Sequence, residues 1–429
     1  MSIRFDAVVI GAGPAGLAAA YELARLGLKV AVLERGKRPG SKNTYGGRVY
    51  LSSIRKSAPD IAKELQQGRL VRKEILELAS EKGVLTISLE LPQGEDNGVV
   101  ISLTKLTETL AQKVESQGGY VICSAKVDSL IIQEGRVLGV KCGNDAVYAN
   151  VVIDAEGVNR LVLERAKLVQ KPSPQDVALG VKEVYRVDPQ LITKLIDVES
   201  DTEGVAVMAF GSFLNYLMGG AFLYTDRNYV HVGIVLYLRE YAKVKDHVIK
   251  FLEQSKQLPI IRTLVKNGEL VEYCAHLVPV RPLTIDLEKL PNGLLPVGDA
   301  GGFIVHLGPI IRGVDYAIVS GVCAARAVAD LLSKEKTISQ VKLVQMFNKY
   351  LEKSELLHSL ELFRKLYQSY EIPEIYARYI RFAVSALKNY LHVRDGVRSL
   401  YSSVMDAARE HGLSTWRLFM DFLRTFRRM

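Results

Sequence analysis

Cysteine is scarce in this 429-residue chain, and no two cysteines form a C-x-x-C pair. The four cysteines are Cys123, Cys142, Cys274 and Cys323. This spacing argues against a zinc site or an iron–sulfur cluster, because both need clustered thiolates. We therefore expect no iron–sulfur cluster in this chain. The low cysteine content also fits a reducing cytoplasm, where disulfides are rare.

Long hydrophobic runs are missing as well. No stretch of about 18 uncharged apolar residues occurs, which is the length that a membrane-spanning helix needs. The long apolar region 303–332 is interrupted by Arg312 and Asp315. The N-terminus enters a strand-like pattern at once, so we expect no signal peptide. These absences predict a cytoplasmic protein whose membrane contact, if any, is peripheral and on the inner face of the cell membrane.

Acidic residues are outnumbered by basic ones, and the formal net charge is +9. This sign suits an anionic cofactor, an acidic partner or an anionic membrane surface. Nucleic acid would also suit it, but the sequence has no helix-turn-helix, RRM or zinc-finger pattern, so we expect no nucleic-acid partner. The length predicts two or three domains.

The N-terminal segment has the pattern strand, helix, strand, with glycines at the first junction. Gly11, Gly13 and Gly16 form a G-x-G-x-x-G motif directly after the first strand. The first glycine permits a tight turn, the second lets a pyrophosphate approach the backbone, and the third lets the helix pack closely on the strand. The helix begins at Pro14 and Ala15, and its N-terminus offers unpaired N–H groups to phosphates. The motif in this context predicts a dinucleotide site.

Glu34 ends the second strand and is followed by Arg35. An acidic side chain at this position accepts hydrogen bonds from a ribose diol. It also repels a 2′-phosphate, which disfavours NADP and leaves FAD or NAD.

Two later segments favour FAD. Residues 151–157 (VVIDAEG) resemble a segment of the FAD-binding flavoproteins that passes near both cofactor and substrate. Residues 294–302 (LLPVGDAGG) resemble the segment whose aspartate, here Asp299, binds the ribityl chain. The helix that follows would point its N-terminus at the flavin, where negative charge builds up on reduction. An ordinary structural role is the alternative for Asp299 and, with more weight, for Asp154.

The rest of the chain alternates between helical and strand-like patterns. Residues 61–67 and 72–83 carry charge runs typical of helices, and 104–119 predicts a helix. Short strands over 120–157 predict a β-rich insertion that returns to the nucleotide-binding sheet. The patterns over 175–240 predict an antiparallel sheet in a second domain.

Residues 40–50 (GSKNTYGGRVY) carry a family resemblance. They resemble the Gly-Ser-Lys-Asn…Gly-Gly-Arg segment of the electron-transfer-flavoprotein:quinone oxidoreductases, and are closest to the FixC branch. Residues 301–321 resemble another segment of that family, and 217–224 (LMGGAFLY) resemble the segment that lines its quinone pocket. The resemblance extends over about residues 3–330.

This resemblance implies that electrons pass from a reduced electron-transfer flavoprotein through FAD to a membrane quinone. Long family members hold a four-iron cluster with cysteines near the C-terminus, but this chain has none after Cys323. In the FixC branch a separate small ferredoxin-like protein carries the cluster, and we expect the same partner here.

The expected fold class is α/β (α+β overall), with a Rossmann-like FAD-binding domain over 1–170 and 275–335. An antiparallel β-sheet domain for the quinone or substrate is expected over 171–274, and a helical region over 336–429.

The flavin performs the redox chemistry, so no catalytic side chain is expected. Gly219 and Gly220 would offer backbone N–H donors to a quinone, and Phe222 and Tyr224 would supply an apolar wall; plain sheet core is the alternative. Arg312 would either neutralise acidic charge near the flavin or pair with Asp315. The expected cofactor-binding residues are Gly11, Gly13, Pro14, Ala15, Gly16, Glu34, Arg35, Ser41, Lys42, Asn43, Gly46, Gly47, Arg48, Val127, Ala155, Gly157, Gly298, Asp299, Gly308, Arg312 and Gly313.

Three other functions were weighed against this one. A geranylgeranyl-reductase-type flavoenzyme shares the fold, but that family usually has a cysteine in the loop where this chain has Thr44 and Tyr45. A flavin monooxygenase is less favoured than the geranylgeranyl-reductase-type enzyme. A relay subunit of an electron-bifurcating complex would hold FAD without reducing quinone.

The last residues, 414–429, combine one apolar face with four arginines. Such a helix can lie at an anionic membrane interface. A packed terminal helix or a partner-docking face is the alternative, and residues 214–224 are a second candidate for membrane contact.

Overall fold

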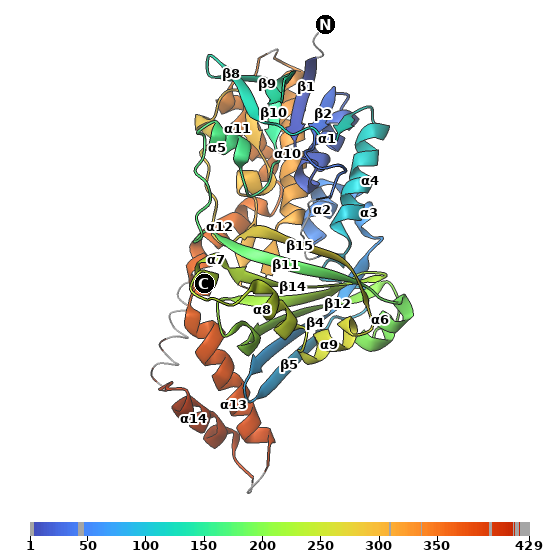
Figure 1. Cartoon of the computed structure of the whole chain (residues 1–429). Coiled ribbons are helices and arrows are strands. Elements are labelled where there is room, and N and C mark those ends of the chain that lie inside the picture. The colour runs from blue at the N-terminus through green and yellow to red at the C-terminus, as the bar shows by residue number, and fades with distance from the viewer. Residues whose placement is uncertain are drawn as a thin grey trace.

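The structure is a computed structural model that describes residues 4–41, 47–308, 310–335, 337–393, 397–414, 416 and 420. Figure 1 shows two β-sheets, with the first above the second and a helical region that ends below both. Both helices and strands build the fold, as the sequence predicts. The expected cofactor residues Lys42, Asn43 and Gly46 and most of the tail 414–429 lie outside the described residues.

The first sheet is the nucleotide-binding sheet. Its strand order within the described residues is β7-β2-β1-β10-β9-β8, and β16 also pairs with β10. The pairings β7–β2, β2–β1, β1–β10 and β10–β16 are parallel, whereas β8, β9 and β10 are antiparallel neighbours. This arrangement confirms a β-rich insertion that returns to the sheet. The bounds are β1 Arg4–Ile10, β2 Val30–Leu33, β7 Tyr120–Ile122, β8 Ser129–Gln133, β9 Arg136–Cys142, β10 Asp145–Asp154 and β16 Leu294–Pro296.

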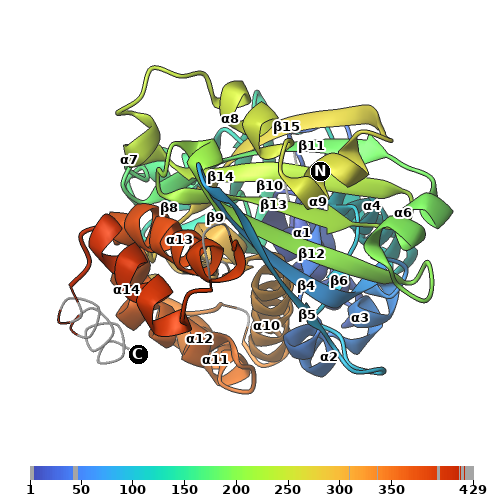
Figure 2. The ribbon, with the colours of Figure 1, turned by 90° about the horizontal axis from the view of Figure 1, so that it is seen from below.

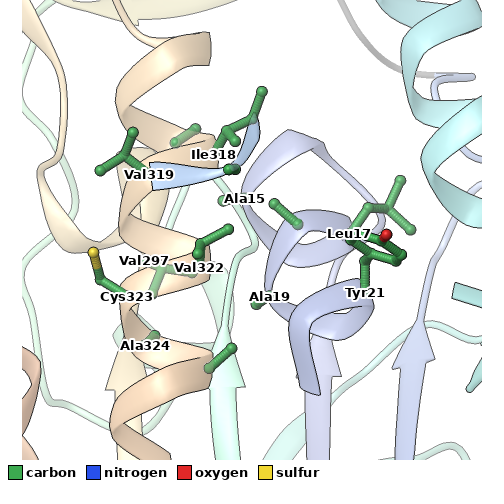
Figure 3. Close-up of a cluster of buried hydrophobic side chains, with 14 of the residues drawn as sticks. Ala15, Leu17, Ala19, Tyr21, Val297, Ile318, Val319, Val322, Cys323 and Ala324 are labelled. Atoms are coloured by element: carbon green, nitrogen blue, oxygen red, sulfur yellow. The ribbon is translucent and has the colours of Figure 1, made fainter. Parts of the chain in front are cut away.

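Two helices of small residues pack against this sheet and against each other. Helix α1 (Pro14–Arg25) and helix α10 (Val314–Leu332) lie side by side in Figure 3, with Ala15 and Ala19 facing Ile318 and Val322. A Cβ added at Gly321 would lie 2.2 Å from the backbone oxygen of Ala15. The helices therefore approach so closely that only glycine fits at this crossing. Helices α2 (Ser52–Ser57), α3 (Pro59–Leu65), α4 (Leu103–Ser116) and α5 (Leu161–Arg165) complete this part of the fold.

The second sheet has the order β15-β11-β14-β13-β12-β4-β6-β3 within the described residues, with β5 paired to β4. It is antiparallel except for the parallel pair β12–β4. Helices α6, α8 and α9 cover the face turned away from the first sheet (Figure 1). The bounds are β3 Arg48–Val49, β4 Arg69–Ser80, β5 Gly83–Glu90, β6 Val99–Val100, β11 Val177–Arg186, β12 Glu203–Gly211, β13 Gly219–Thr225, β14 Tyr229–Tyr237, β15 Glu269–Pro279, α6 Pro189–Ile196, α7 Leu238–Tyr241, α8 Val248–Ser255 and α9 Pro259–Val265.

One expectation about this sheet is wrong. The charge run over 72–83 predicted a helix, but most of it forms strand β4, between β5 and β12. Along most of β4, buried side chains such as Val71, Ile75 and Ala79 alternate with partly exposed ones, which is the period of a strand. Pairing with two distant strands outweighs the weak helical preference of the charged residues.

The second sheet also takes strands from segment 48–100, which the sequence assigns to the FAD-binding domain. Strand β15 likewise crosses the boundary that we placed between 274 and 275. The division into domains remains a prediction.

The region after α10 is helical, as the sequence predicts. Helices α13 and α14 form a hairpin beside β5 in both views (Figures 1 and 2). In the described part of the chain, no helix has the length and hydropathy that crossing a bilayer requires. The bounds are α11 Gln340–Leu351, α12 Leu356–Leu366, α13 Ile380–Leu391 and α14 Leu400–Glu410.

Candidate cofactor and substrate site

A cavity of about 330 Å³ lies between the two sheets. The carboxyl ends of β1, β2 and β10 and the N-terminal ends of α1 and α10 contribute to one side, and β11, β13 and β15 contribute to the other. The expected cofactor residues that line it are Gly11, Gly13, Pro14, Ala15, Glu34, Arg35, Arg48, Val127, Ala155, Gly157, Gly298, Asp299 and Gly313. The fold thus brings residues that are far apart in the sequence to one site. Their individual roles remain predictions.

The glycine turn has the geometry that a pyrophosphate needs. Gly11 has a φ of +96°, which favours glycine. A Cβ at Gly16 would lie 2.0 Å from the backbone oxygen of Gly11, so the third glycine allows the close packing of α1. A Cβ at Gly13 would meet nothing within 4 Å. Since Gly13 lines the cavity, the space next to it is available to a phosphate group.

Glu34 is fixed at the end of β2 by backbone N–H groups. Its Oε2 accepts a hydrogen bond from Ala12 N at 2.9 Å, and its Oε1 accepts one from Gly36 N at 2.5 Å. The carboxylate lines the cavity at one end, beside Arg35. This position suits an acceptor for the hydroxyls of a ribose.

Asp299 follows β16 and lines the cavity. Burial raises the pKa of Asp299 to about 6, against the opposing effect of the Arg160 guanidinium. Asp154, by contrast, is fully buried and does not line the cavity; its Oδ1 accepts a hydrogen bond from Glu156 N at 3.0 Å. Burial, with the neighbouring charge of Glu156, raises the pKa of Asp154 well above its ordinary value. The structural alternative therefore suits Asp154 better than a direct contact with a cofactor.

The raised pKa of Asp299 predicts how the stability of the FAD-free protein depends on pH. Because the folded state favours the protonated carboxyl, folding loses stability as the pH rises from about 4 through about 6. Asp299→Asn stays neutral and avoids this loss. We expect the variant to be more stable than wild type by about 2 kcal/mol at pH 7.5, and this difference to shrink towards pH 4. Urea unfolding at several pH values measures it, and a difference that is independent of pH would contradict the prediction.

Arg48 and Tyr50 form part of the cavity wall. The sequence predicted Arg48 as a site residue but not Tyr50. The Arg48 guanidinium pairs with Glu74, and its Nε donates a hydrogen bond to Asn97 O at 3.0 Å. The guanidinium carbon of Arg48 lies 4.6 Å from the centre of the Tyr50 ring. Glu74 lies outside any motif, so no local signal in the sequence predicts this arrangement.

Phe222 and Tyr224 also line the cavity, as expected for two residues of β13. Their rings are stacked, with centroids 5.3 Å apart. Lys182 on β11 and His276 on β15 line the same cavity, and sequence reasoning missed both. The strand alternation places Lys182 on the face opposite to Val181 and Glu183, but the sequence does not show which face meets the cavity.

Several expected residues do not line the cavity. A Cβ at Gly219 would lie 2.4 Å from Val235 O, and one at Gly220 would lie 2.7 Å from the Phe210 ring, so close packing within the sheet accounts for both glycines. Arg312 pairs with Asp315 at 2.7 Å, which is the structural alternative. The other expected residues that do not line the cavity are Gly16, Ser41, Gly47 and Gly308.

No group of three or more His, Cys, Asp or Glu side chains that could hold a metal ion occurs in the part of the chain that the structure describes.

Two family models match two parts of the chain that line the cavity. A family model described as "FAD dependent oxidoreductase" matches residues 6–163, which include the glycine turn and Glu34. A second, described as "ETF-QO, ubiquinone-binding", matches residues 177–278, which include β11 and β13. The fold and cavity therefore define the chain as an FAD-dependent oxidoreductase.

Relatives define the family more narrowly. The chain is 34% identical over 415 residues to "Probable electron transfer flavoprotein-quinone oxidoreductase YdiS" of Escherichia coli K12, with 96% of each chain covered. It is 34% identical over 388 residues to "Protein FixC" of the same strain, with 90% of each covered. The chain belongs to the electron-transfer-flavoprotein:quinone oxidoreductase family, in its FixC branch.

A solved structure shows the same fold. A geranylgeranyl bacteriochlorophyll reductase-like protein from Thermoplasma acidophilum has a TM-score of 0.70 at 19% identity, with 96% of this chain and 97% of that chain covered.

Proposed function

We propose that this protein accepts electrons from a reduced electron-transfer flavoprotein and passes them through FAD to a membrane quinone. The observation that carries the proposal is the shared cavity. Residues suited to FAD line one side, and residues of the segment that matches the ubiquinone-binding model line the other. Electron transfer to a quinone requires such proximity of the two binding sites.

FAD supplies the redox chemistry when bound. The chain's own residues bind and orient it: Gly13 leaves room for the pyrophosphate, Glu34 accepts from the ribose, and Asp299 accepts from the ribityl chain. The N-termini of α1 and α10 both open on the cavity, and their partial positive charges favour the phosphates and the electron-rich flavin. Phe222 and Tyr224 provide a wall against which a planar ring can pack.

We further propose that a small ferredoxin-like protein carries the iron–sulfur cluster of the complex. Support comes from the identity to FixC and from the wide spacing of the cysteines in the sequence. Mixing the two purified proteins with the electron-transfer flavoprotein and measuring a complex by size-exclusion chromatography would test this partnership.

Anaerobic spectroscopy tests the electron path itself. The FAD-loaded protein is reduced with its electron-transfer flavoprotein, and a menaquinone analogue is then added. We expect the visible absorbance of the oxidised flavin to return as the quinone is reduced. Flavin that stays reduced would contradict quinone reduction and favour the relay subunit. Saturation of a prenyl lipid in place of quinone reduction would favour a prenyl reductase.

We propose that the hairpin of α13 and α14 contacts the membrane surface from which the quinone comes. Leu391 is 66% exposed, Val397 is 90% exposed and Tyr401 is 76% exposed, so large apolar side chains gather at the tip of this hairpin. On β5, which lies beside α13, Ile87 and Leu89 are exposed too. Basic residues dominate the chain as a whole, which favours an anionic surface.

Replacing Leu391 and Val397 with Glu should therefore weaken membrane binding. Each change removes an apolar group from the interface and adds a negative charge, so we expect at least a tenfold loss in affinity, or about 1.4 kcal/mol. Sedimentation with vesicles of phosphatidylethanolamine and phosphatidylglycerol measures it. Val341→Glu, at an exposed site of α11, is the matched control. Equal membrane binding by the double variant and the control would argue against the hairpin as the membrane contact.

A further inference from the structure

Two tyrosines in the cavity wall have hydroxyls that make no hydrogen bond to any other residue that the structure describes. Tyr50 follows strand β3, and Tyr224 lies on β13. Both residues line the cavity, and both are largely enclosed by protein. Neither hydroxyl is among the fully buried polar atoms, so both are accessible and free to donate to a ligand in the cavity.

Both rings are held in place by their neighbours. The Tyr50 ring lies near two guanidinium groups, with the central carbon of Arg48 at 4.6 Å and that of Arg312 at 5.2 Å from its centre. Arg48 is held by Glu74, and Arg312 is held by Asp315. These contacts fix the Tyr50 ring before a ligand binds, so binding costs less side-chain entropy.

Tyr224 is fixed in a different way. Its backbone pairs with Ala206 on β12 and with His231 on β14, and its ring is stacked on Phe222. The Tyr224 side chain therefore points from the interior of the sheet towards the same cavity that Tyr50 lines.

Both phenols act as neutral donors at physiological pH. Burial raises the pKa of Tyr50 and that of Tyr224, so neither hydroxyl ionises. A neutral phenol donates one hydrogen bond and suits an uncharged carbonyl oxygen.

Apolar side chains make up much of the cavity wall, although the Arg48 guanidinium lies beside the Tyr50 ring. Phe222, Ile304 and Val314 line the cavity and suit the face of a planar ring. A quinone fits this combination, because it offers carbonyl oxygens at the edge of an apolar ring. A carbon–carbon double bond of an isoprenoid offers no acceptor, so it would displace water from both hydroxyls without replacing the lost hydrogen bonds, which disfavours its binding.

We propose that Tyr50 and Tyr224 donate hydrogen bonds to the carbonyl oxygens of the bound quinone. These bonds select a carbonyl compound over a hydrocarbon of the same shape. This inference rests on the proposed function. It gives the Tyr224 hydroxyl a polar role in addition to the apolar wall expected from the sequence, and it assigns a role to Tyr50, for which the sequence suggested none.

A pair of matched probes tests the selection. The FAD-loaded protein is titrated in a calorimeter with 2,3-dimethyl-1,4-naphthoquinone and with 2,3-dimethylnaphthalene, which lacks the carbonyls. We expect Tyr50→Phe and Tyr224→Phe each to weaken quinone binding about tenfold and to leave hydrocarbon binding unchanged. Tyr350→Phe is the control, because Tyr350 lies on helix α11 outside the cavity lining, where its hydroxyl donates to Asp330 of α10 at 2.7 Å.

Folding and cofactor retention are checked by thermal unfolding and by the ratio of flavin to protein absorbance. Equal quinone affinity in wild type and both variants would overturn the inference alone. A variant that loses FAD but keeps its affinity for the quinone would also overturn it, since the hydroxyl would then serve the cofactor. If wild type neither binds the naphthoquinone nor is oxidised by it, the proposed function fails and the inference fails with it.

Discussion

Gly13→Ala is expected to weaken FAD binding strongly while leaving the FAD-free protein folded. Gly13 has φ −82° and ψ 179°, which alanine adopts freely, and its added Cβ would meet no protein atom within 4 Å. The loss of a favourable residue at the N-terminus of α1 and the reduced entropy of the unfolded chain roughly cancel, so stability should change by less than about 1 kcal/mol. The methyl group would occupy the space for the pyrophosphate. We expect FAD affinity to fall about 100-fold, measured by flavin fluorescence during titration of the FAD-free protein.

Gly16→Ala provides the contrast for this experiment. Its Cβ would lie 2.0 Å from Gly11 O, so this variant should lose stability as well as FAD. Retention of FAD by Gly13→Ala at wild-type affinity would mean that the pyrophosphate does not lie against this turn. A large loss of stability in the same variant would instead show that the glycine serves the packing of the fold.

Gly321→Val is expected to prevent stable folding. Even a Cβ at this position would lie 2.2 Å from Ala15 O, and the two methyl groups of valine would force α10 away from α1 (Figure 3). Overpacking against backbone cannot be relieved by a rotamer change, so we expect a loss of at least about 3 kcal/mol. Urea unfolding measures the change, and an insoluble product on expression would agree with it.

Ala329→Val is the matched control, because this half-buried residue lies on the same helix. It places the same two γ-methyl groups on the helix as Gly321→Val does. Its cost should stay below about 1 kcal/mol, which is the difference in helix propensity between alanine and valine. Wild-type stability in Gly321→Val would show that the two helices can move apart without cost.

The nucleotide-binding part could be predicted from the sequence because its signals are local. The three glycines, the first turn of α1 and the acidic residue after β2 all lie between residues 11 and 34. Each has a requirement that one residue type meets, such as the positive φ of Gly11. The buried strands on either side are apolar throughout, as in other parallel sheets. Residues 40–50 then distinguished the family from others with the same fold.

Strand β4 could not be predicted in the same way. The charges over 72–83 have helical spacing, but the preference of each residue for a helix amounts to a few tenths of a kcal/mol. Pairing with β12 and β5 and burial of side chains such as Val71 and Ile75 contribute more. The partner strand β12 lies more than a hundred residues further along the chain, so no local pattern reports it.

The sequence by itself determined the nucleotide-binding motif, FAD as cofactor and the family, because these depend on residue types at short spacing. Only the tertiary structure decided which side chains share the cavity. Tyr50, Glu74 and Tyr224 come from three distant segments, and strand pairing in the second sheet brings Glu74 and Tyr224 to the same face. Packing of that sheet against the nucleotide-binding part, which depends on the shape of the whole folded chain, then places Tyr50 and Tyr224 in the wall of the cavity.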